Sequence, residues 1–227
     1  SVGLTKSTGG TVTLSGENTY TGTTTISAGT LALGADNVLS DETEVSVTGI
    51  FDLADNSDTI NVLSGAGSVL LGSGTLSVGG NNGSGSFSGV IAESGGLTKL
   101  GSGTVTLSGE NTYTGTTTIS NGTLTYGGSN ILSTGAVTIN GGTLNIDSYT
   151  DTVGAVTLES GSITGTGTLT GSSYAVKSGA IGAILGGSSV GLTKSTGGTV
   201  TLSGENTYTG TTTISAGTLA LGADNVL

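Results

Sequence analysis

The chain has 227 residues, with 45 Gly, six Tyr, two Phe and no Pro, Cys or His, and 33% of it is hydrophobic. Fifteen acidic residues against four Lys give a formal net charge of −11, which excludes binding to nucleic acid and to anionic membranes. The absence of Cys excludes disulfides and thiol chemistry, and the few large apolar residues argue against a thick two-layer domain.

Residues 3–39 form a segment that returns with substitutions at 96–132 and unchanged at 191–227. The first 39 residues are identical to the last 39, and Ser189 follows Ser1 by 188 positions. This identity predicts a window from a longer tandem array. It divides the chain into a first half-repeat at 1–95, a second half-repeat at 96–188, and the start of the next repeat at 189–227.

A shorter cycle of about 19–20 residues runs inside each half-repeat. Its starts fall near residues 4, 24, 45, 62 and 82, then near 97, 117, 137, 156 and 176, with 192 opening the next repeat. A glycine-rich chain with a strict period and a positive mean hydropathy of 0.23 favours order over disorder. We expect five cycles in each half-repeat, the fifth one shortened, and about twelve in the chain.

Each cycle reads as short strands separated by turns of Gly, Asn, Asp and Ser. Val137 and Ile139 are expected to point inward with Thr138 outward, and Leu144 and Ile146 inward again. Asn-Gly pairs at 121–122 and 140–141 would also suit antiparallel hairpins. Because a shift of one cycle places like on like, we predict parallel stacking: an all-β, right-handed, single-stranded parallel β-helix (β-solenoid) with three sheets and a narrow apolar interior.

Several side chains of the repeated segment fall at predicted corners. Tyr20, Tyr113 and Tyr208 are expected to cover a corner and not to bind a ligand. Strand alternation would turn Lys6, Lys99 and Lys194 inward, but the favoured interpretation is a corner with an exposed ion pair to an acid of the same segment. The acids concerned are Glu17, Glu110 and Glu205. Phe87 is expected to fill space in the shortened fifth cycle.

The acidic residues suggest one weak metal site. Asp52, Asp55 and Asp58 form the tightest group and could bind Ca²⁺ through turn oxygens. Their spacing departs from both the EF-hand loop and the nonapeptide repeat, so solvated turn acids are the preferred interpretation. With no His or Arg, and with the acids scattered, we predict no catalytic residue and no cofactor.

Outward Thr residues form the main surface feature. They are expected to stack on one sheet as Thr104 and Thr106, Thr123 and Thr125, Thr143 and Asn145, and Ser162 and Thr164. Such an array resembles the flat Thr-x-Thr surfaces of ice-binding solenoids. Thr is also an ordinary exposed strand residue, and we expect the array to break at the fifth cycle and, in the other half, at Ala32 and Asp52.

Residues 96–124 carry the pattern G-L-T-K-x-G-x-G-T-x-T-L-S-G-x-N-T-Y-T-G-x-T-T-I-x-x-G-T-L. This pattern resembles the autotransporter passenger-associated β-strand repeat of Gram-negative surface proteins. The other two copies depart from it with Ser-Thr-Gly-Gly at 7–10 and 195–198. The resemblance implies a right-handed parallel β-helix that is secreted and displayed on the bacterial cell surface as an adhesin, stalk or fibrous part, with no chemistry of its own.

We therefore expect a non-enzymatic structural protein that forms an extracellular filament or rod-like surface stalk. The alternatives are an adhesin that binds a cell-surface ligand and a functional amyloid built from many short chains. Expected partners are other copies of the same repeat, stacked end to end or bundled side by side, and possible cell-surface ligands. Neither nucleic acid nor membrane insertion is expected.

Overall fold

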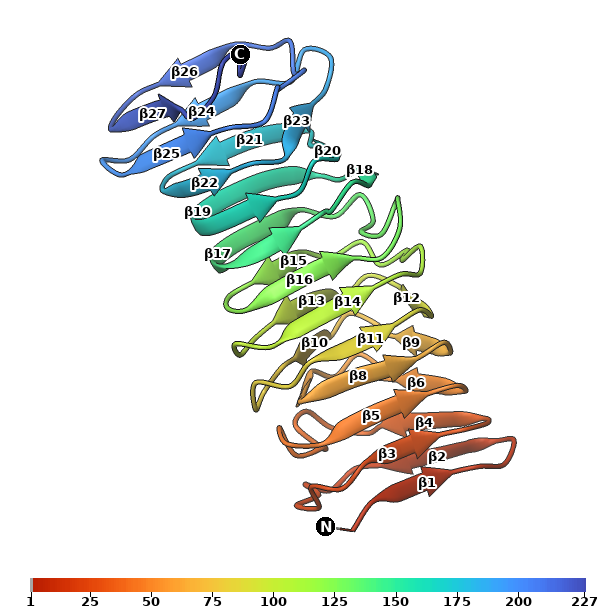
Figure 1. Cartoon of the computed structure of the whole chain (residues 1–227). Helices are drawn as coiled ribbons and strands as arrows, with labels where there is room; N and C mark the ends of the chain where they lie inside the picture. The colour runs from red at the N-terminus through yellow and green to blue at the C-terminus, as the bar shows by residue number, and fades with distance from the viewer. Residues whose placement is uncertain (1) are drawn as a thin grey trace.

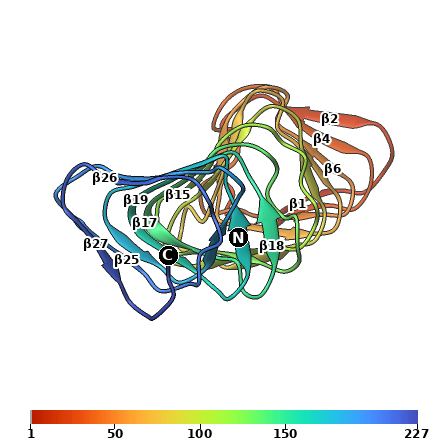
Figure 2. The same cartoon turned by 90° about the horizontal axis from the view of Figure 1, so that it is seen from above.

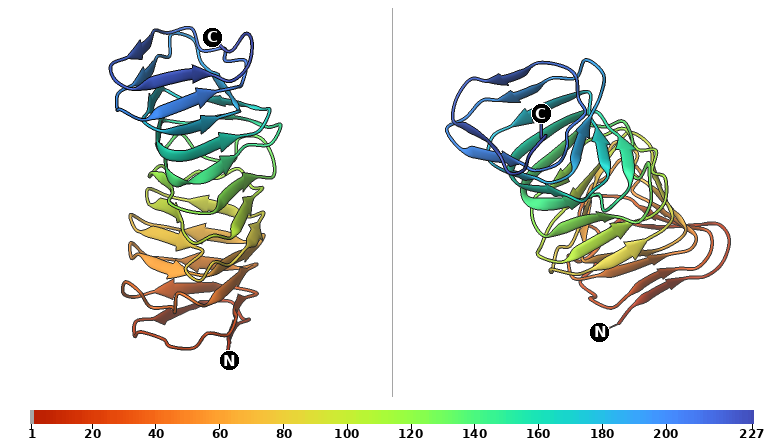
Figure 3. Two further views of the ribbon diagram at one scale, coloured as in Figure 1. Left: turned by 60° about the vertical axis from the view of Figure 1, so that its left-hand side comes forward. Right: turned by 45° about the horizontal axis from the view of Figure 1, so that its top comes forward.

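The computed structural model describes residues 2–227, so Ser1 of the first half-repeat lies outside the described part. It consists of short strands and turns, and every strand pairing within those residues is parallel. The strands stack into a solenoid of about 11 turns, roughly 19 residues apart, with the two ends of the chain at opposite ends of the stack (Figures 1 and 3). The all-β parallel solenoid predicted from the period is confirmed.

Three faces run along the stack, and the chain visits them in the order face 1, face 2, face 3 and then face 1 again. Face 1 contains β1 (Leu4–Lys6), β3 (Thr24–Ile26), β5 (Glu44–Val47), β8 (Val62–Gly65), β11 (Gly85–Phe87), β14 (Thr104–Leu107), β16 (Thr123–Tyr126), the second parts of β17 (Val137–Asn145) and β19 (Ala155–Thr164), β22 (Gly179–Ile181), β25 (Thr199–Leu202) and β27 (Thr218–Leu221).

The other two faces are built from the strands between these. Face 2 contains β2 (Thr11–Leu14), β4 (Thr30–Leu33), β6 (Ile50–Asp52), β9 (Ser68–Leu70), β12 (Val90–Ala92), β18 (Thr150–Thr152), β20 (Thr168–Thr170) and β23 (Ile184–Gly186). Face 3 contains β7 (Asp58–Ile60), β10 (Thr75–Val78), β13 (Gly96–Lys99), β15 (Thr117–Ile119), the first parts of β17 and β19, β21 (Ser173–Val176), β24 (Leu192–Lys194) and β26 (Thr212–Ile214).

The winding is right-handed. In Figure 1 the strands of face 1, such as β14 and β16, run to the right in front, while strands of face 3, such as β13 and β15, run to the left behind them. The chain climbs from the N-terminus at the bottom to the C-terminus at the top, which is the sense of a right-handed screw. Seen from above, successive coils are turned and displaced relative to one another (Figure 2).

The interior is narrow and apolar, as the alternation predicted. Val137, Ile139, Leu144 and Ile146 are all buried, while Thr138 between them is half-buried on the outside. The Asn-Gly pair at 140–141 turns no hairpin, because β17 continues through it around the corner from face 3 to face 1. Like side chains lie over like, so the stack is held by parallel backbone ladders and small apolar files along its axis.

One predicted cycle start was wrong. We placed a start near residue 82, but residues 79–84 form a turn between β10 on face 3 and β11 on face 1. Gly79 and Asn82 have positive φ values of 102° and 61°, which suit a turn and not a strand. The second half has a strand in the corresponding place, β21, so the first half is shorter by one strand, a third of a coil.

Candidate functional site

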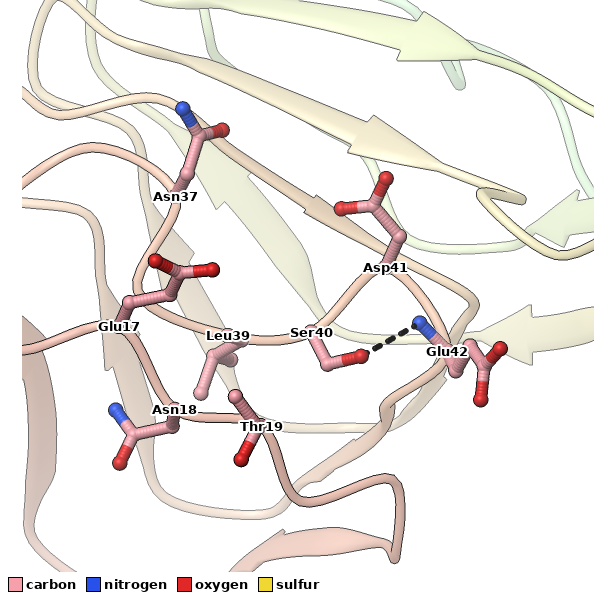
Figure 4. Close-up of a pocket in the computed structure, with 8 residues that line it drawn as sticks. All are labelled: Glu17, Asn18, Thr19, Asn37, Leu39, Ser40, Asp41 and Glu42. Atoms are coloured by element: carbon pink, nitrogen blue, oxygen red, sulfur yellow. Dashed lines mark hydrogen bonds between the residues drawn. The ribbon is translucent and has the colours of Figure 1, made fainter.

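A hollow of about 520 Å³ opens at the corner where two coils of the first repeated segment meet (Figure 4). Its walls come from two stretches of chain about 20 residues apart. The lining residues are Glu17, Asn18, Thr19, Asn37, Leu39, Ser40, Asp41 and Glu42. No pattern in the sequence indicates this hollow, because its side chains meet only when one coil lies on the next.

The Asn residues of this corner hold the two coils together. The backbone N–H of Asn18 donates to the Val38 carbonyl at 2.8 Å, and its side-chain amide donates to the carbonyls of Gly16 and Val38 at 2.7 and 3.1 Å. Asn111 bonds in the same way to Gly109 and Ile131 in the second copy. These amide hydrogen bonds between neighbouring coils fix the shape of the corner and therefore the shape of the hollow.

Three carboxyl groups line the hollow, from Glu17, Asp41 and Glu42, and no basic side chain accompanies them. Figure 4 shows Glu17 and Asn37 on one side and Asp41 on the other, with the Glu42 N–H donating to the Ser40 hydroxyl at 3.3 Å. An acidic hollow edged by amides and hydroxyls suits a cationic or hydroxyl-bearing group on a partner. After the shared Leu-Ser pair, Asp41 and Glu42 are replaced in the second copy by Thr134 and Gly135, which carry no charge.

The three acids of the candidate calcium site do not converge. The Asp52 carboxylate accepts the Ala54 N–H at 2.8 Å, and the Asp55 carboxylate accepts the Ser73 N–H at 2.9 Å. Asp58 is buried, and one of its oxygens accepts the N–H groups of Val38 and Leu39, both at 3.0 Å. Among residues 2–227 no group of three or more acidic, His or Cys side chains could hold a metal ion, so we propose no calcium site.

Asp58 and Asp151 are buried acids that tie one coil to the next. Asp151 accepts the N–H of Leu132 at 2.8 Å in the second half, where Asp58 serves Val38 and Leu39 in the first. Burial raises the pKa of Asp58 to about 6, although the N–H groups of Leu39, Thr59 and Val38 act to lower it. Burial also raises the pKa of Asp151.

Asp58 should therefore make the fold more stable in mild acid. Its folded pKa lies above the ordinary value of 3.8, so its contribution is complete below that value and is lost as the pH rises through about 6. We expect the thermal midpoint to fall by a few degrees between about pH 4 and about pH 7, and this fall to shrink in Asp58→Asn. Asp147→Asn, the same change at an exposed acid, should keep the full fall. Equal pH dependence in both variants would contradict the assignment.

The three Lys residues of the repeated segments point into the solenoid. Lys6, Lys99 and Lys194 are buried, and each ammonium donates to backbone carbonyls and to no carboxylate. Lys99 donates to the carbonyls of Leu100, Gly101 and Asn121, the last two at 2.9 and 3.4 Å.

The favoured interpretation, an exposed corner with an ion pair to Glu17, Glu110 or Glu205, was wrong. The ion pair of the described residues joins Lys177 to Glu159 at 2.7 Å. Burial of the three Lys residues is possible without an acid because turn carbonyls converge on each amine. The alternation of the strand therefore indicated the direction of these side chains better than charge pairing did.

The Tyr residues cover corners as expected. Tyr113 is fully buried and shares a hydrogen bond of 2.5 Å with the Thr117 hydroxyl. Tyr20 and Tyr208 are partly buried against the same core and make the equivalent contacts at 2.8 Å with Thr24 and Thr212. Each ring is committed to packing and each hydroxyl to a threonine four residues later, which leaves a structural role.

The outward Thr array lies on face 1. The in-register partners Thr104 and Thr123, and Thr106 and Thr125, stack as predicted, and Thr143 over Ser162 continues the array with a hydroxyl contact of 3.0 Å. Ala32 and Asp52 do not interrupt it, because they lie on face 2, in β4 and β6. The first half contributes Thr25, Ser46, Ser64 and Ser86 to face 1.

Comparison with known proteins links three parts of the chain to one family. The family described as passenger-associated-transport-repeat matches residues 4–33, 97–125 and 192–221. These matches coincide with the three copies of the repeated segment. No solved structure matches the chain.

One curated relative is the adhesin BmaC autotransporter of Brucella suis biovar 1 (strain 1330), which is 40% identical over an alignment of 242 residues. The match covers 95% of this chain and 7% of the relative, so the chain spans about 7% of the relative's length. No helix within residues 2–227 is long and apolar enough to cross a membrane.

Proposed function

We propose, from the premise that this chain belongs to the autotransporter passengers built with passenger-associated-transport repeats, that it forms a rod-like, non-catalytic stalk segment of a surface adhesin. The repeats and the adhesin relative indicate an extracellular, cell-surface-exposed passenger segment. The stalk role rests on one observation: parallel coils follow one another along the whole described chain, with no second layer over residues 2–227.

The rod-like role also explains the charge and the surface. Fifteen acids spread over a narrow solenoid help a long object stay soluble. The proposal keeps the division into two half-repeats at 1–95 and 96–188, with 189–227 opening the next repeat. End-to-end stacking of identical repeats, and side-by-side bundling, belong to the same proposal, because exposed coil edges favour pairing with further coils.

The adhesive role assigns contact with a cell-surface ligand to the acidic hollow around Glu17, Asp41 and Glu42. Its walls combine negative charge with hydroxyl and amide groups, as a site for a cationic or hydroxylated surface group would. This contact is separable from the stalk role, because the fold does not depend on those three side chains.

Binding of the isolated chain to whole animal cells tests the adhesive role. The chain should bind saturably, and the triple variant Glu17→Gln, Asp41→Asn and Glu42→Gln should lower binding at least about tenfold, the effect of losing about 1.4 kcal/mol. A matched triple, Glu110→Gln, Asp147→Asn and Asp224→Asn, makes the same change of charge at exposed acids elsewhere and should bind normally. An equal loss of binding in both triple variants would show that binding depends on the total negative charge of the chain and not on the hollow.

Electron microscopy of the same preparations tests the stalk role. The chain should appear as a narrow rod whose length does not change when a chelator is added. A compact particle would overturn the stalk. Growth of long fibres from the isolated chain would support the alternative of a functional amyloid, whose units assemble without a covalent array.

A further inference from the structure

Two identical segments of the chain occupy different faces of the solenoid. In the first copy, Leu4–Lys6 lies on face 1 and Thr11–Leu14 on face 2. In the last copy, the same residues, Leu192–Lys194 and Thr199–Leu202, lie on faces 3 and 1. The local fold of the segment is unchanged, so the difference comes from the chain between the copies.

The strand register shows how far each half advances. Leu4 is followed on face 1 by Thr24, Val45 and Leu63, and the alignment of Gly65 with Phe87 places Gly85 next. Gly85 then pairs with Val105, and not with Leu97, the residue equivalent to Leu4. Leu97 lies on face 3, two faces beyond Gly85, so the first half covers four and two-thirds coils.

The second half covers five whole coils. Leu97 is followed on face 3 by Thr117, Val137, Val156, Tyr174 and then Leu192, each an in-register partner of the one before. Leu192 is the residue equivalent to Leu97, so the second half returns to its own face. The whole repeat therefore advances by nine and two-thirds coils.

The missing third of a coil lies in one short turn. In the second half the chain leaves β20 on face 2, forms β21 on face 3 and then β22 on face 1. In the first half the equivalent of β20 is β10, which already lies on face 3, and the turn at 79–84 carries the chain directly to β11 on face 1. One strand replaced by one turn shifts all that follows by one face.

The surface of the segment turns with it. The hollow of the first copy lies on face 3, where Val38 and Leu39 donate to Asp58 of β7. The last copy forms a hollow at the same corner from Asn206, Tyr208, Thr209, Gly210, Thr212 and Leu227, of which Asn206 and Leu227 are the equivalents of Asn18 and Leu39 in the first hollow. That hollow lies on face 2, because the Asn206 side chain accepts the Leu185 N–H of β23 at 2.8 Å.

We propose that the 188-residue repeat is a rotating display unit. Every further copy presents the same contact surface shifted by one face of the solenoid, so that three copies place it on all three faces of the rod. The partner that fits such a display is a surface with many closely spaced copies of one binding group, because contacts in several directions raise avidity without any new contact chemistry. The use of the display rests on the proposed adhesive function, whereas the rotation rests on strand register alone.

Cysteine pairs test the rotation, and the chain has no other thiol. Ser77 and Thr98 are in-register neighbours on face 3, about 4.8 Å apart as adjacent strands are. The variant S77C/T98C should be joined within one molecule by a short bifunctional thiol reagent, with a yield at least about tenfold above S77C/A92C. The pair T98C/T118C, neighbours on face 3, is the positive control.

A first half of five whole coils, like the second half, would place Ser77 beside Ala92, as Thr170 lies beside Gly186, and away from Thr98. Efficient joining of S77C/A92C together with failure of S77C/T98C would therefore overturn the rotation. Because the readout is the mass of the joined peptides, it does not depend on ligand binding. A chain that fails to bind cells but joins residues 77 and 98 keeps the rotation and loses only the adhesive function.

Discussion

Phe87→Ala should be the most damaging single substitution tested on this chain, with a loss of about 3–5 kcal/mol in the free energy of unfolding. Phe87 is fully buried in β11, and its ring lies so close to Gly89 that a Cβ there would come within 2.6 Å of it. The ring fills the coil at the junction of the two halves, where the sequence predicted that extra bulk was needed. Its removal leaves a cavity in a core only one side chain wide.

The form of the unfolding transition should change as well. A solenoid is stabilised by contacts between neighbouring coils, so a weakened junction lets the segments on either side unfold separately. We expect urea denaturation followed by circular dichroism to show two steps in Phe87→Ala and one in the parent chain. Val90→Ala is the control: Val90 lies in the next strand, β12, but is 39% exposed, so its truncation should cost under about 0.5 kcal/mol. Equal effects of the two variants would contradict the assigned role.

Lys99→Met should lower the free energy of unfolding by about 2–3 kcal/mol. Lys99 is 2% exposed, and this burial lowers the pKa of its ammonium. Methionine fills a similar volume but leaves the carbonyls of Gly101 and Asn121 without this donor, and each buried carbonyl left unpaired costs about 1–3 kcal/mol. Removing the cost of a buried charge offsets part of that loss.

Lys177→Met is the matched control, measured by the same denaturation experiment. Lys177 pairs with Glu159 at 2.7 Å, but the two side chains are 38% and 34% exposed, and solvent-exposed ion pairs contribute about 0–1 kcal/mol. The control should therefore stay within about 0.5 kcal/mol of the parent. A Lys99→Met chain as stable as this control would show that the converging carbonyls find other donors or water.

The sequence alone could not predict which groups come together at the hollow and around the buried Lys residues, and the reason is physical. Glu17 lies about one coil before Asp41 and Glu42, so their convergence depends on the path of the corner between them. The amine of Lys99 is held by backbone carbonyls, which every residue has and no pattern of side chains reveals. Strand alternation still indicated the inward direction of Lys99, because alternation is a property of the backbone.

The sequence by itself determined that this chain stacks in parallel coils. A shift of one cycle places Thr117 over Leu97 and Val137 over Thr117, and only parallel stacking pairs every strand with its equivalent. The inward side chains followed from the same period. Parallel stacking and the inward side chains are local features, and the sequence of every cycle encodes them.

Only the tertiary structure decided which face each repeated segment occupies. The face that a segment occupies depends on the number of strands before it along the chain. Residues 79–84 lower this number by one, because they form a turn in place of a strand. Gly-Gly-Asn-Asn-Gly-Ser consists of turn-forming residues, but only the register of β10 and β11 with their neighbours shows that the turn stands where a strand is missing. A single local choice is thereby carried along the whole stack, which is why identical sequences at the two ends face different directions.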